Sequence, residues 1–386
     1  MSRTSVALLG ATGSIGTQTL EVLRREPARF ELVSIAAGGG NVDRIIEIAR
    51  EFGVKRIGVP TQEVRASVLS QLPNVEVVVG DEGLSELARS ADTIVNAVVG
   101  FAGLPVTLAA LEAGKRLALA NKESLIAAAP LVERVRNTAG AELLPIDSEH
   151  CAIHQALAGA SNAENYREVR RLILTASGGP FRGWTREDLD GVTKAQALAH
   201  PTWAMGPKIT IDSSTLMNKG LEVLEASALF GIAANRIDVV VHPQSIVHSM
   251  VEYIDGSVIA QLSKPDMRLP IAYCLGLPER LDHAWGALDF KTAFSLDFSP
   301  PDLENFPALK LAYEVAEVGG AAPAWLSAAN EVAVAAFLDD RVTWRQISEV
   351  VSKTLDFYEP CTLESLSELL DADKRAREVA TANLPK

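Results

Sequence analysis

The fold is decided by the stretch Ser5-Val6-Ala7-Leu8-Leu9-Gly10-Ala11-Thr12-Gly13-Ser14-Ile15-Gly16. Its first five residues form a short apolar run, which is typical of a buried parallel strand. An amphipathic segment, Thr17–Arg25, follows the glycines and indicates a helix. Strand, glycine-rich turn and helix in this order form the context that a dinucleotide-binding fingerprint requires.

Each glycine of the turn has a separate expected role. Gly10 permits a tight turn, Gly13 lets the backbone approach a pyrophosphate, and Gly16 lets the helix pack against the strand. The helix N-terminus then offers backbone N–H groups and the positive end of its dipole to phosphates. We therefore predict nucleotide binding here, the alternative being a tight turn without a ligand.

The next predicted strand, Phe30–Ala36, indicates which dinucleotide is bound. An NAD enzyme usually carries an acidic residue at the end of this strand, where it binds the ribose hydroxyls. Here the strand is followed by Ala-Gly-Gly-Gly-Asn at 37–41, and the first carboxylate, Asp43, comes two residues later. The absence of a carboxylate that would repel a 2′-phosphate favours NADP over NAD.

Short apolar runs alternate with helical segments up to about Asp147, which predicts a Rossmann-like, mostly parallel sheet covered on both faces. The further expected strands are Arg56–Val59, Val75–Val79, Thr93–Val99, Arg116–Ala120 and Glu142–Pro145. Ligands bind at the carboxyl ends of such strands. Asn121-Lys122-Glu123 and Asp147-Ser148-Glu149 both fall at such ends, so we expect them in the site.

The rest of the chain has a different pattern. The middle region predicts an α+β domain with strands Val169–Ala176, Asp238–His242, Ser249–Ile254 and Val258–Leu262 and a helix Ser214–Phe230 closed by Gly231. The expected fold class is α/β, with a dinucleotide-binding domain at 1–147, a catalytic domain at 148–277, a linker at 278–306 and a C-terminal helical bundle at 307–386.

Residues 196–208 are expected to form a flexible lid. Their centre, His200-Pro201-Thr202-Trp203-Ala204-Met205-Gly206-Pro207-Lys208, contains two prolines and a glycine, which disfavour regular structure. Because an exposed loop seldom keeps a tryptophan unless it covers something, we predict that the loop closes over substrate and excludes water. The alternative is a packed loop in which Trp203 is permanently buried.

Two stretches predict a metal site. Pro145–His150 is expected to be the end of a strand, which would place Asp147 and Glu149 on one face. In the predicted helix, Asn218 and Glu222 share a face, with Lys219 beside them. If the fold joins the two stretches, three carboxylates suit Mg²⁺ or Mn²⁺, and the amide and ammonium suit a phosphate or sugar hydroxyl. The alternative is ordinary solvated surface.

Composition excludes several classes of partner. The 386 residues are 48% hydrophobic and 22% charged, and the net charge of −13 argues against nucleic acid or an anionic membrane. The three cysteines show no paired spacing, which favours a reducing cytoplasm over a disulfide scaffold or zinc site. We expect a cytoplasmic protein, because no apolar run reaches membrane length and the chain enters its first strand at once.

Seven motifs together resemble the 1-deoxy-D-xylulose 5-phosphate reductoisomerase family of the methylerythritol phosphate route to isoprenoids. They are Gly-Ala-Thr-Gly-Ser-Ile-Gly at 10–16, Asn-Lys-Glu at 121–123, Asp-Ser-Glu-His at 147–150, Ser-Gly-Gly-Pro-Phe at 177–181, His-Pro-Thr-Trp-Ala-Met-Gly at 200–206, Met-Asn-Lys-Gly-Leu-Glu at 217–222 and His-Pro-Gln-Ser at 242–245. The resemblance extends to Leu326–Glu331. It implies a homodimer that binds NADPH, a divalent cation (Mg²⁺, Mn²⁺ or Co²⁺) and a small phosphorylated sugar.

The resemblance also implies roles for single residues. Metal ligands would be Asp147, Glu149 and Glu222. The substrate would contact Lys122, Ser148, Glu149, Ser177, His200, Ser213, Asn218, Lys219 and Glu222, and of these Lys122, Glu149, His200 and Lys219 are expected to be catalytic. NADPH would contact Thr12, Gly13, Ser14, Ile15, Gly39, Gly40, Asn41, Asn121, Glu123 and Gly206. The family often has a basic residue where Gly40 stands, so the preference for NADPH over NADH is expected to be weaker here.

Two other readings compete with this one. A semialdehyde dehydrogenase also opens with Gly-x-Thr-Gly-x-x-Gly and would need a cysteine nucleophile, for which Cys151 is the candidate near a motif. An NADP-sensing binding protein would bind the cofactor without chemistry. It would not require three convergent carboxylates.

Overall fold

The computed structural model describes residues 3–158, 166–203 and 205–385. Contacts divide the chain into two compact units. Unit 1 comprises the chain up to Leu125, Leu131–Cys151 and Asp266–Trp285. Unit 2 comprises Ile126–Pro130, Ala152–Pro265 and the chain from Gly286 onward. The four domain boundaries expected from the sequence remain a prediction.

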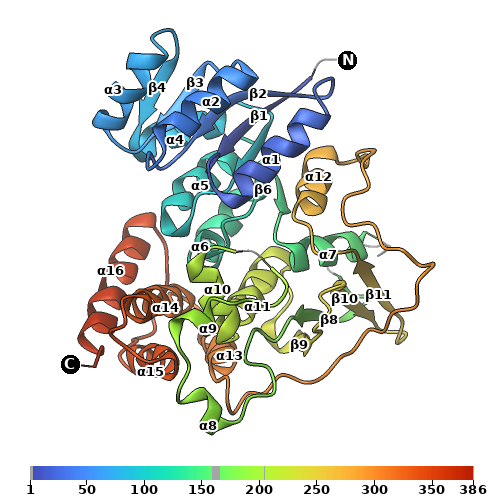
Figure 1. Ribbon diagram of the computed structural model, residues 1–386. Helices are drawn as coiled ribbons and strands as arrows, with labels where there is room; N and C mark the ends of the chain where they lie inside the picture. Colours follow the sequence, from blue (N-terminus) through green and yellow to red (C-terminus); the bar gives the residue numbers. More distant parts are fainter. Residues whose placement is uncertain (1–2, 159–165, 204, 386) are drawn as a thin grey trace. The chain divides into compact units, whose positions relative to one another are not determined.

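Unit 1 is built on a seven-stranded sheet in the order β4-β3-β2-β1-β5-β6-β7, and every neighbouring pair is parallel. The chain order reverses at β1, between β2 and β5, which is the switch point where such sheets bind ligands. The strands are β1 Thr4–Leu9, β2 Phe30–Ala36, β3 Arg56–Val59, β4 Glu76–Val79, β5 Thr93–Asn96, β6 Arg116–Leu119 and β7 Glu142–Pro145 (Figure 1).

Helices connect these strands and cover the sheet (Figure 1). They are α1 Ser14–Arg25, α2 Val42–Phe52, α3 Gln62–Gln71, α4 Gly80–Arg89, η1 Gly100–Gly103, α5 Leu104–Glu112 and α6 Lys122–Val135. Helix α7 (Ser148–Leu157) follows the last strand, and its residues from Ala152 on belong to unit 2. A later helix, α12 (Arg268–Gly276), returns to this unit. Arg268 pairs with Glu21 of α1 at 3.0 Å, and Arg116 of β6 donates to the carbonyl oxygen of Leu277 at 2.7 Å.

Unit 2 contains a four-stranded sheet in the order β11-β10-β8-β9. Here β10 runs antiparallel to both β8 and β11, whereas β8 and β9 are parallel. Its strands are β8 Val169–Ala176, β9 Ile237–Val241, β10 Val247–Tyr253 and β11 Val258–Leu262. The crossover between β8 and β9 contains α8 Arg186–Leu189, α9 Lys194–Ala197, α10 Pro207–Ser214, α11 Met217–Phe230 and η2 Ala234–Arg236.

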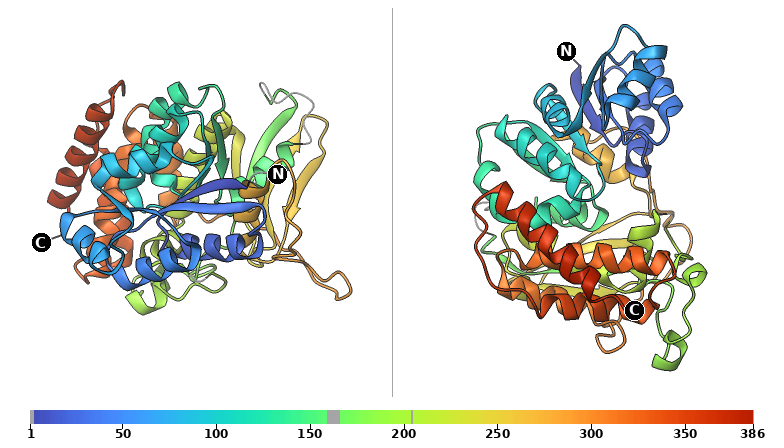
Figure 2. Two further views of the ribbon diagram at one scale, coloured as in Figure 1. Left: turned by 90° about the horizontal axis from the view of Figure 1, so that it is seen from above. Right: turned by 90° about the vertical axis from the view of Figure 1, so that its left-hand side faces the viewer.

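Four helices complete unit 2: α13 Ala308–Val318, α14 Ala322–Leu338, α15 Trp344–Leu355 and α16 Leu366–Ala382. Helix α14 packs against α13, α15 and α16. Figure 2 shows α14, α15 and α16, the last three helices of the chain, side by side. The helical bundle and the α/β fold class predicted from the sequence are confirmed. Within the described residues, no helix is both long and apolar enough to cross a membrane.

The prediction that Pro145–His150 is the end of a strand was wrong. Strand β7 ends at Pro145, and α7 begins at Ser148. The carbonyl oxygen of Asp147 accepts a hydrogen bond from the backbone N–H of Cys151 at 2.8 Å, so Asp147 precedes the first helical turn. Aspartate before a helix followed by glutamate in the first turn stabilises the positive helix end, and this preference prevails over the strand-like alternation.

The single helix expected at Ser214–Phe230 is also divided. Helix α10 ends at Ser214 and α11 starts at Met217, because Leu216 adopts a left-handed conformation with φ 61°. A left-handed leucine breaks helical hydrogen bonding and is strained, since its Cβ crowds the backbone. The predicted end of the helix is confirmed: Gly231 has φ 62° and caps α11.

Candidate active site

The glycine turn lies at the carboxyl end of β1, at the switch point. Gly10 has φ +92°, and a Cβ there would lie 2.2 Å from the carbonyl oxygen of Ala97, the residue that follows the neighbouring strand β5. A Cβ on Gly16 would lie 2.3 Å from the oxygen of Gly10. The fold therefore requires glycine at both positions, as the sequence predicts for a tight turn and close helix packing.

The N-terminus of α1 fits a phosphate group. Gly13 is extended at the N-cap, with no side-chain cap hydrogen bond, and the first turn of α1 contains no acidic residue. Gly13 is exposed, and a Cβ there would make an ordinary contact of 3.4 Å with the carbonyl oxygen of Gly10. Thr12, Ser14 and Ile15 are at most half-buried around this helix end.

The turn after β2 contains three residues expected to bind NADPH. Gly39 has φ +79° and packs against Val64, whereas a Cβ on Gly40 would meet nothing within 4 Å. Asn41 caps α2, because its Oδ1 accepts a hydrogen bond from the backbone N–H of Arg44 at 3.0 Å. Gly40, like Gly38, can therefore carry a longer side chain without moving its neighbours.

Asn121 holds the turns after β5 and β6 together. Its Nδ2 donates to the carbonyl oxygens of Val98 and Gly100 at 2.6 and 2.7 Å, and its Oδ1 accepts from the backbone N–H of Ser124 at 3.0 Å. The side chain is buried at 2% exposure. Asn121 thus shapes the loop at the switch point, and the partly buried Glu123 lies in the first turn of α6.

A charged group forms where β6 and β7 end. The Nζ of Lys122 lies 2.5 Å from the Oδ2 of Asp147, and the Nδ1 of His150 lies 3.9 Å from the same oxygen. Ser148 donates to the Oε2 of Glu149 at 2.6 Å. Lys122 and His150 are buried, while both carboxylates are partly exposed. Unit 1 therefore presents two carboxylates and an ammonium group at the ligand-binding edge of its sheet.

Unit 2 provides a second polar group at the start of α11. Asn218 donates to Glu222 Oε1 at 2.6 Å, and Lys219 forms an ion pair with Glu222 Oε2. This confirms the expectation that the three residues share one helix face. Glu222 is 1% exposed and Lys219 is 3% exposed, so the carboxylate is stabilised in the interior by an amide and an ammonium.

Ser177 and His200 contact each other. The Nε2 of His200 lies 3.0 Å from the Oγ of Ser177, which also accepts from the backbone N–H of Gly179 at 3.2 Å. The Nδ1 of His200 accepts from the backbone N–H groups of Thr202 and Trp203. Burial lowers the pKa of His200 below its ordinary value. The ring is therefore neutral near pH 7, with its proton on Nε2.

Ser213 lies against the same glycine turn. Gly179 has φ +66°, and a Cβ there would lie 2.7 Å from the carbonyl oxygen of Ser213. Only glycine permits this approach, which brings the loop after β8 to the end of α10. Ser177 and Ser213, both expected to contact the substrate, thus belong to two segments in direct contact.

The segment expected to be a lid is irregular only in part. Residues 198–203 and 205–206 form no helix or strand, α9 covers 194–197, and Gly206 precedes α10 with Pro207 at its first position. Trp203 is half-buried, with its ring centroid 6.3 Å from that of His248. Ala204 lies outside the described residues. The lid role itself stays a prediction.

Several polar residues of the site were not singled out from the sequence. Glu225 is 1% exposed and lies one turn after Glu222. Asp212 is 1% exposed, pairs with Lys208 at 2.7 Å and accepts from Asn330 Nδ2 at 2.7 Å. The spacing of Lys208 and Asp212, four residues apart on one helix, was a signal for their pairing. No local signal links Asn330 to them.

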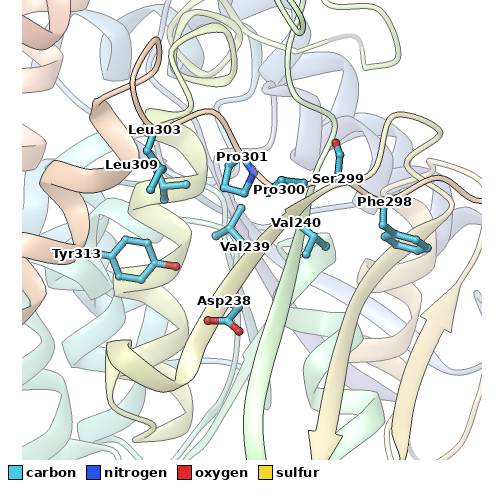
Figure 3. Close-up of a pocket in the computed structure, with 10 residues that line it drawn as sticks. All are labelled: Asp238, Val239, Val240, Phe298, Ser299, Pro300, Pro301, Leu303, Leu309 and Tyr313. Atoms are coloured by element: carbon cyan, nitrogen blue, oxygen red, sulfur yellow. The ribbon is translucent and has the colours of Figure 1, made fainter.

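A cavity of ≈ 550 Å³ in unit 2 contains none of the predicted site residues (Figure 3). It lies beside the edge strand β9, under Pro300, Pro301 and Leu303, with Tyr313 of α13 on one side (Figure 3). Burial raises the pKa of Tyr313, whose hydroxyl donates to the carbonyl oxygen of Ile237 at 2.8 Å.

The fold and these residues define a class: an α/β enzyme with a dinucleotide turn at its switch point and a second, α+β unit with its own polar centre. Family models described as 1-deoxy-D-xylulose 5-phosphate reductoisomerase, the C-terminal domain of that reductoisomerase, and DXP reductoisomerase C-terminal domain match residues 6–129, 143–230 and 262–379. The chain belongs to the 1-deoxy-D-xylulose 5-phosphate reductoisomerase family.

Relatives and solved structures cover the whole length. The chain is 50% identical to the reductoisomerase of Chlorobaculum tepidum over 97% of this chain and 98% of that one, and 50% identical to that of Rhodococcus jostii over 98% and 93%. The Zymomonas mobilis enzyme in complex with NADPH superposes with a TM-score of 0.93 at 43% identity, covering 100% of both chains. A reductoisomerase in complex with NADPH, fosmidomycin and magnesium gives a TM-score of 0.93 at 42% identity, covering 99% and 98%.

Proposed function

We infer that this chain is an NADPH-dependent oxidoreductase that isomerises and reduces 1-deoxy-D-xylulose 5-phosphate to 2-C-methyl-D-erythritol 4-phosphate with a divalent cation. The observation that carries this conclusion is its full-length similarity to reductoisomerases, including those in complex with NADPH and magnesium. This activity is a step of isoprenoid biosynthesis by the methylerythritol phosphate route.

NADPH fits the turn after β1. Gly10 and Gly16 have no room for a side chain, Gly13 is exposed at the start of α1, and α1 presents its N-terminus without a side-chain cap. We propose that Thr12, Gly13, Ser14 and Ile15 receive the pyrophosphate. The open turn at Gly39, Gly40 and Asn41 would receive the adenosine phosphate, with Asn121, Glu123 and Gly206 completing the site.

A hard divalent cation fits the carboxylates. Asp147 and Glu149 follow β7 in unit 1, and Glu222 is the buried carboxylate of α11 in unit 2. We propose that these three residues are the metal ligands, since oxygen anions are what Mg²⁺, Mn²⁺ and Co²⁺ accept here. Lys122 forms an ion pair with Asp147, and Lys219 forms one with Glu222, so each unit supplies an ammonium group beside its carboxylate.

The substrate phosphate is assigned to unit 2. Ser177 and Ser213 lie on the two segments joined at Gly179, and Asn218 and Lys219 start α11. A serine-and-amide pocket at a helix N-terminus with a nearby ammonium suits a phosphate dianion. Binding energy from this remote group positions the reacting carbons.

The remaining groups act on the sugar. Bound NADPH supplies a hydride and the bound cation polarises substrate oxygens. We propose that Lys122 and Ser148 hold substrate hydroxyls, and that Glu149 and Lys219 hold and move protons on them. The neutral His200 donates from Nε2, and the loop carrying Trp203 excludes water while the carbon skeleton rearranges.

We also propose a homodimer formed through β11. This strand is at the edge of its sheet, with Val258 49% and Ile259 43% exposed, and the adjoining Ile254 is 67% exposed. An exposed apolar edge strand pairs readily with a second copy. Val258→Lys should yield monomers in light scattering, whereas Leu370→Lys on α16, which is also 49% exposed, should leave the dimer intact. A Val258→Lys dimer of unchanged mass would reject β11 as the interface.

We propose a cytoplasmic location because of the state of the cysteines. Cys151 and Cys274 are buried and Cys361 is exposed, and none of the three forms a disulfide. Cysteines persist as thiols in a reducing compartment. The burial of Cys151 in α7 also gives no support to the dehydrogenase reading, which needs an accessible nucleophile.

The test follows NADPH absorbance with purified protein and 1-deoxy-D-xylulose 5-phosphate, with Mn²⁺ or with a chelator. Oxidation that requires both substrate and metal is expected. NADPH binding without oxidation under any metal would support a sensor instead. Turnover that survives chelation but stops on thiol alkylation would support a dehydrogenase.

A further inference from the structure

Trp344, the first residue of α15, lies between the two segments that carry the phosphate-binding serines. Its indole Nε1 donates to the Oγ of Ser214 at 2.9 Å, beside Ser213 at the end of α10. Its ring meets that of Phe181, four residues after Ser177, edge-on with 5.4 Å between centroids. Trp344 is 4% exposed and Phe181 is 1% exposed, so both contacts are in the interior.

The hydroxyl of Ser214 both accepts and donates a hydrogen bond. It accepts from Trp344 and donates to the carbonyl oxygen of Ile211 at 2.7 Å. Because Ser214 is buried, losing the indole donor leaves an acceptor with no replacement from water. The bond to Trp344 therefore fixes the last turn of α10, and with it the backbone of Ser213.

A second helix of the bundle holds α10 two residues earlier, at Asp212. Asn330 of α14 donates to one carboxylate oxygen of Asp212 at 2.7 Å, and Lys208 pairs with the other at 2.7 Å. Asn330 and Asp212 are both almost fully buried. Helix α10 is thus anchored by side chains from α14 and α15 on either side of Ser213.

The other contact of Trp344 bears on the loop after β8. Phe181 packs between Trp344 and Trp184, whose ring centroid lies 4.9 Å away. The backbone just before Phe181 cannot move freely, because Gly179 lies against the carbonyl oxygen of Ser213. A shift of Phe181 would therefore move the turn that carries Ser177.

We propose that Trp344 is a positioning residue for the phosphate subsite: by binding Ser214 and packing on Phe181, it fixes the spacing between Ser177 and Ser213. The proposal rests on the function inferred above and gives the C-terminal bundle a role in substrate recognition. It assigns Trp344 no contact with substrate.

The test is a double-mutant cycle with Trp344→Phe, Ser214→Ala and the double variant in the full chain. Phenylalanine keeps an aromatic ring and removes only the donor and part of the volume. The dissociation constant for inorganic phosphate is measured by calorimetry, the KM for substrate by NADPH absorbance, and NADPH affinity by fluorescence. Each single variant should weaken phosphate binding about threefold to tenfold, with a matching rise in KM and unchanged NADPH affinity. The double variant should add little, because both changes remove the same bond.

Trp325→Phe is the matched control. Trp325 is also a buried tryptophan of the bundle, 3% exposed, but its ring lies against Tyr358. Trp325→Phe should lower the melting temperature as Trp344→Phe does and leave phosphate affinity unchanged. Equal phosphate affinity in wild type and Trp344→Phe would overturn the positioning role alone. A wild-type protein that turns over substrate without measurable phosphate binding would overturn the subsite and the positioning role together.

Discussion

The Nε2 of His200 and the Oγ of Ser177 lie 3.0 Å apart, which ties the loop that follows α9 to the turn that follows β8. The other ring nitrogen accepts two backbone N–H groups, from Thr202 at 3.1 Å and Trp203 at 2.9 Å. Protonation of Nδ1 would abolish both of these bonds. The neutral ring therefore holds the loop in shape, in keeping with the lowered pKa that burial causes.

The loop should loosen in acid. The pKa of His200 is lowered in the folded protein, so the unfolded chain takes up this proton first, near pH 6.5. The stabilising contribution is fully present above about pH 6.5 and is lost as the pH falls toward the lowered pKa. We expect the substrate KM to rise as the pH falls toward the lowered pKa of His200, where the folded enzyme takes up this proton, and to rise more steeply in wild type than in His200→Asn, which keeps an acceptor without titrating. A constant ratio of the two KM values between about pH 5 and 8 would contradict this, since titration of the substrate phosphate affects both proteins equally.

Glu222→Gln should disable the cation site and spare the cofactor. The carboxylate is 1% exposed between Asn218 and Lys219, and the neutral amide removes one of the three proposed anionic ligands without changing the size of the side chain. We expect kcat/KM at a fixed Mg²⁺ concentration to fall about 100-fold, with partial recovery at higher Mg²⁺ and NADPH affinity unchanged.

Glu252→Gln is the control for the loss of a buried carboxylate. Glu252 is 7% exposed and pairs with Arg171 at 2.6 Å on the sheet of unit 2. This variant should lose stability but keep the Mg²⁺ dependence of wild type. If Glu222→Gln showed that same unchanged dependence, Glu222 would have to be removed from the ligand set.

Gly40→Arg should strengthen the preference for NADPH over NADH. A Cβ at Gly40 meets no atom within 4 Å, and its φ lies outside the left-handed region, so arginine enters without strain. A guanidinium beside the 2′-phosphate should lower the KM for NADPH about fivefold and leave that for NADH unchanged. The gain should shrink as salt is added. Gly40→Gln, which adds bulk without charge, should show no gain, and an equal gain in both variants would exclude the charge explanation.

What the sequence could predict depended on whether the signal was local. Strand β2 has the bounds that were predicted, because it is a short apolar run followed by a glycine-rich turn. The strand predicted over Pro145–His150 was wrong because acidic residues at every second position are typical of a strand face, whereas an aspartate just before a helix also favours the start of that helix. The break at Leu216 had no signal, since leucine has no preference for a left-handed conformation. The contact of Trp344 with Ser214 joins residues 130 positions apart, and only the folded chain reveals it.

Trp203→Ala decides whether the loop covers substrate or is a permanently packed segment. Trp203 is half-buried and touches the ring of His248, whose Nε2 lies 2.9 Å from the Oγ of Ser263. A covering loop gains most of its contacts from bound substrate. We therefore expect Trp203→Ala to cost about 1 kcal/mol or less in unfolding free energy and to raise the substrate KM about tenfold. A permanently packed tryptophan would instead cost about 3–5 kcal/mol, as we expect for Trp325→Ala, which removes a side chain only 3% exposed. Denaturant unfolding and steady-state kinetics on both variants separate the cases, because a large stability loss with an unchanged KM at Trp203 would identify a packed loop with no part in covering substrate.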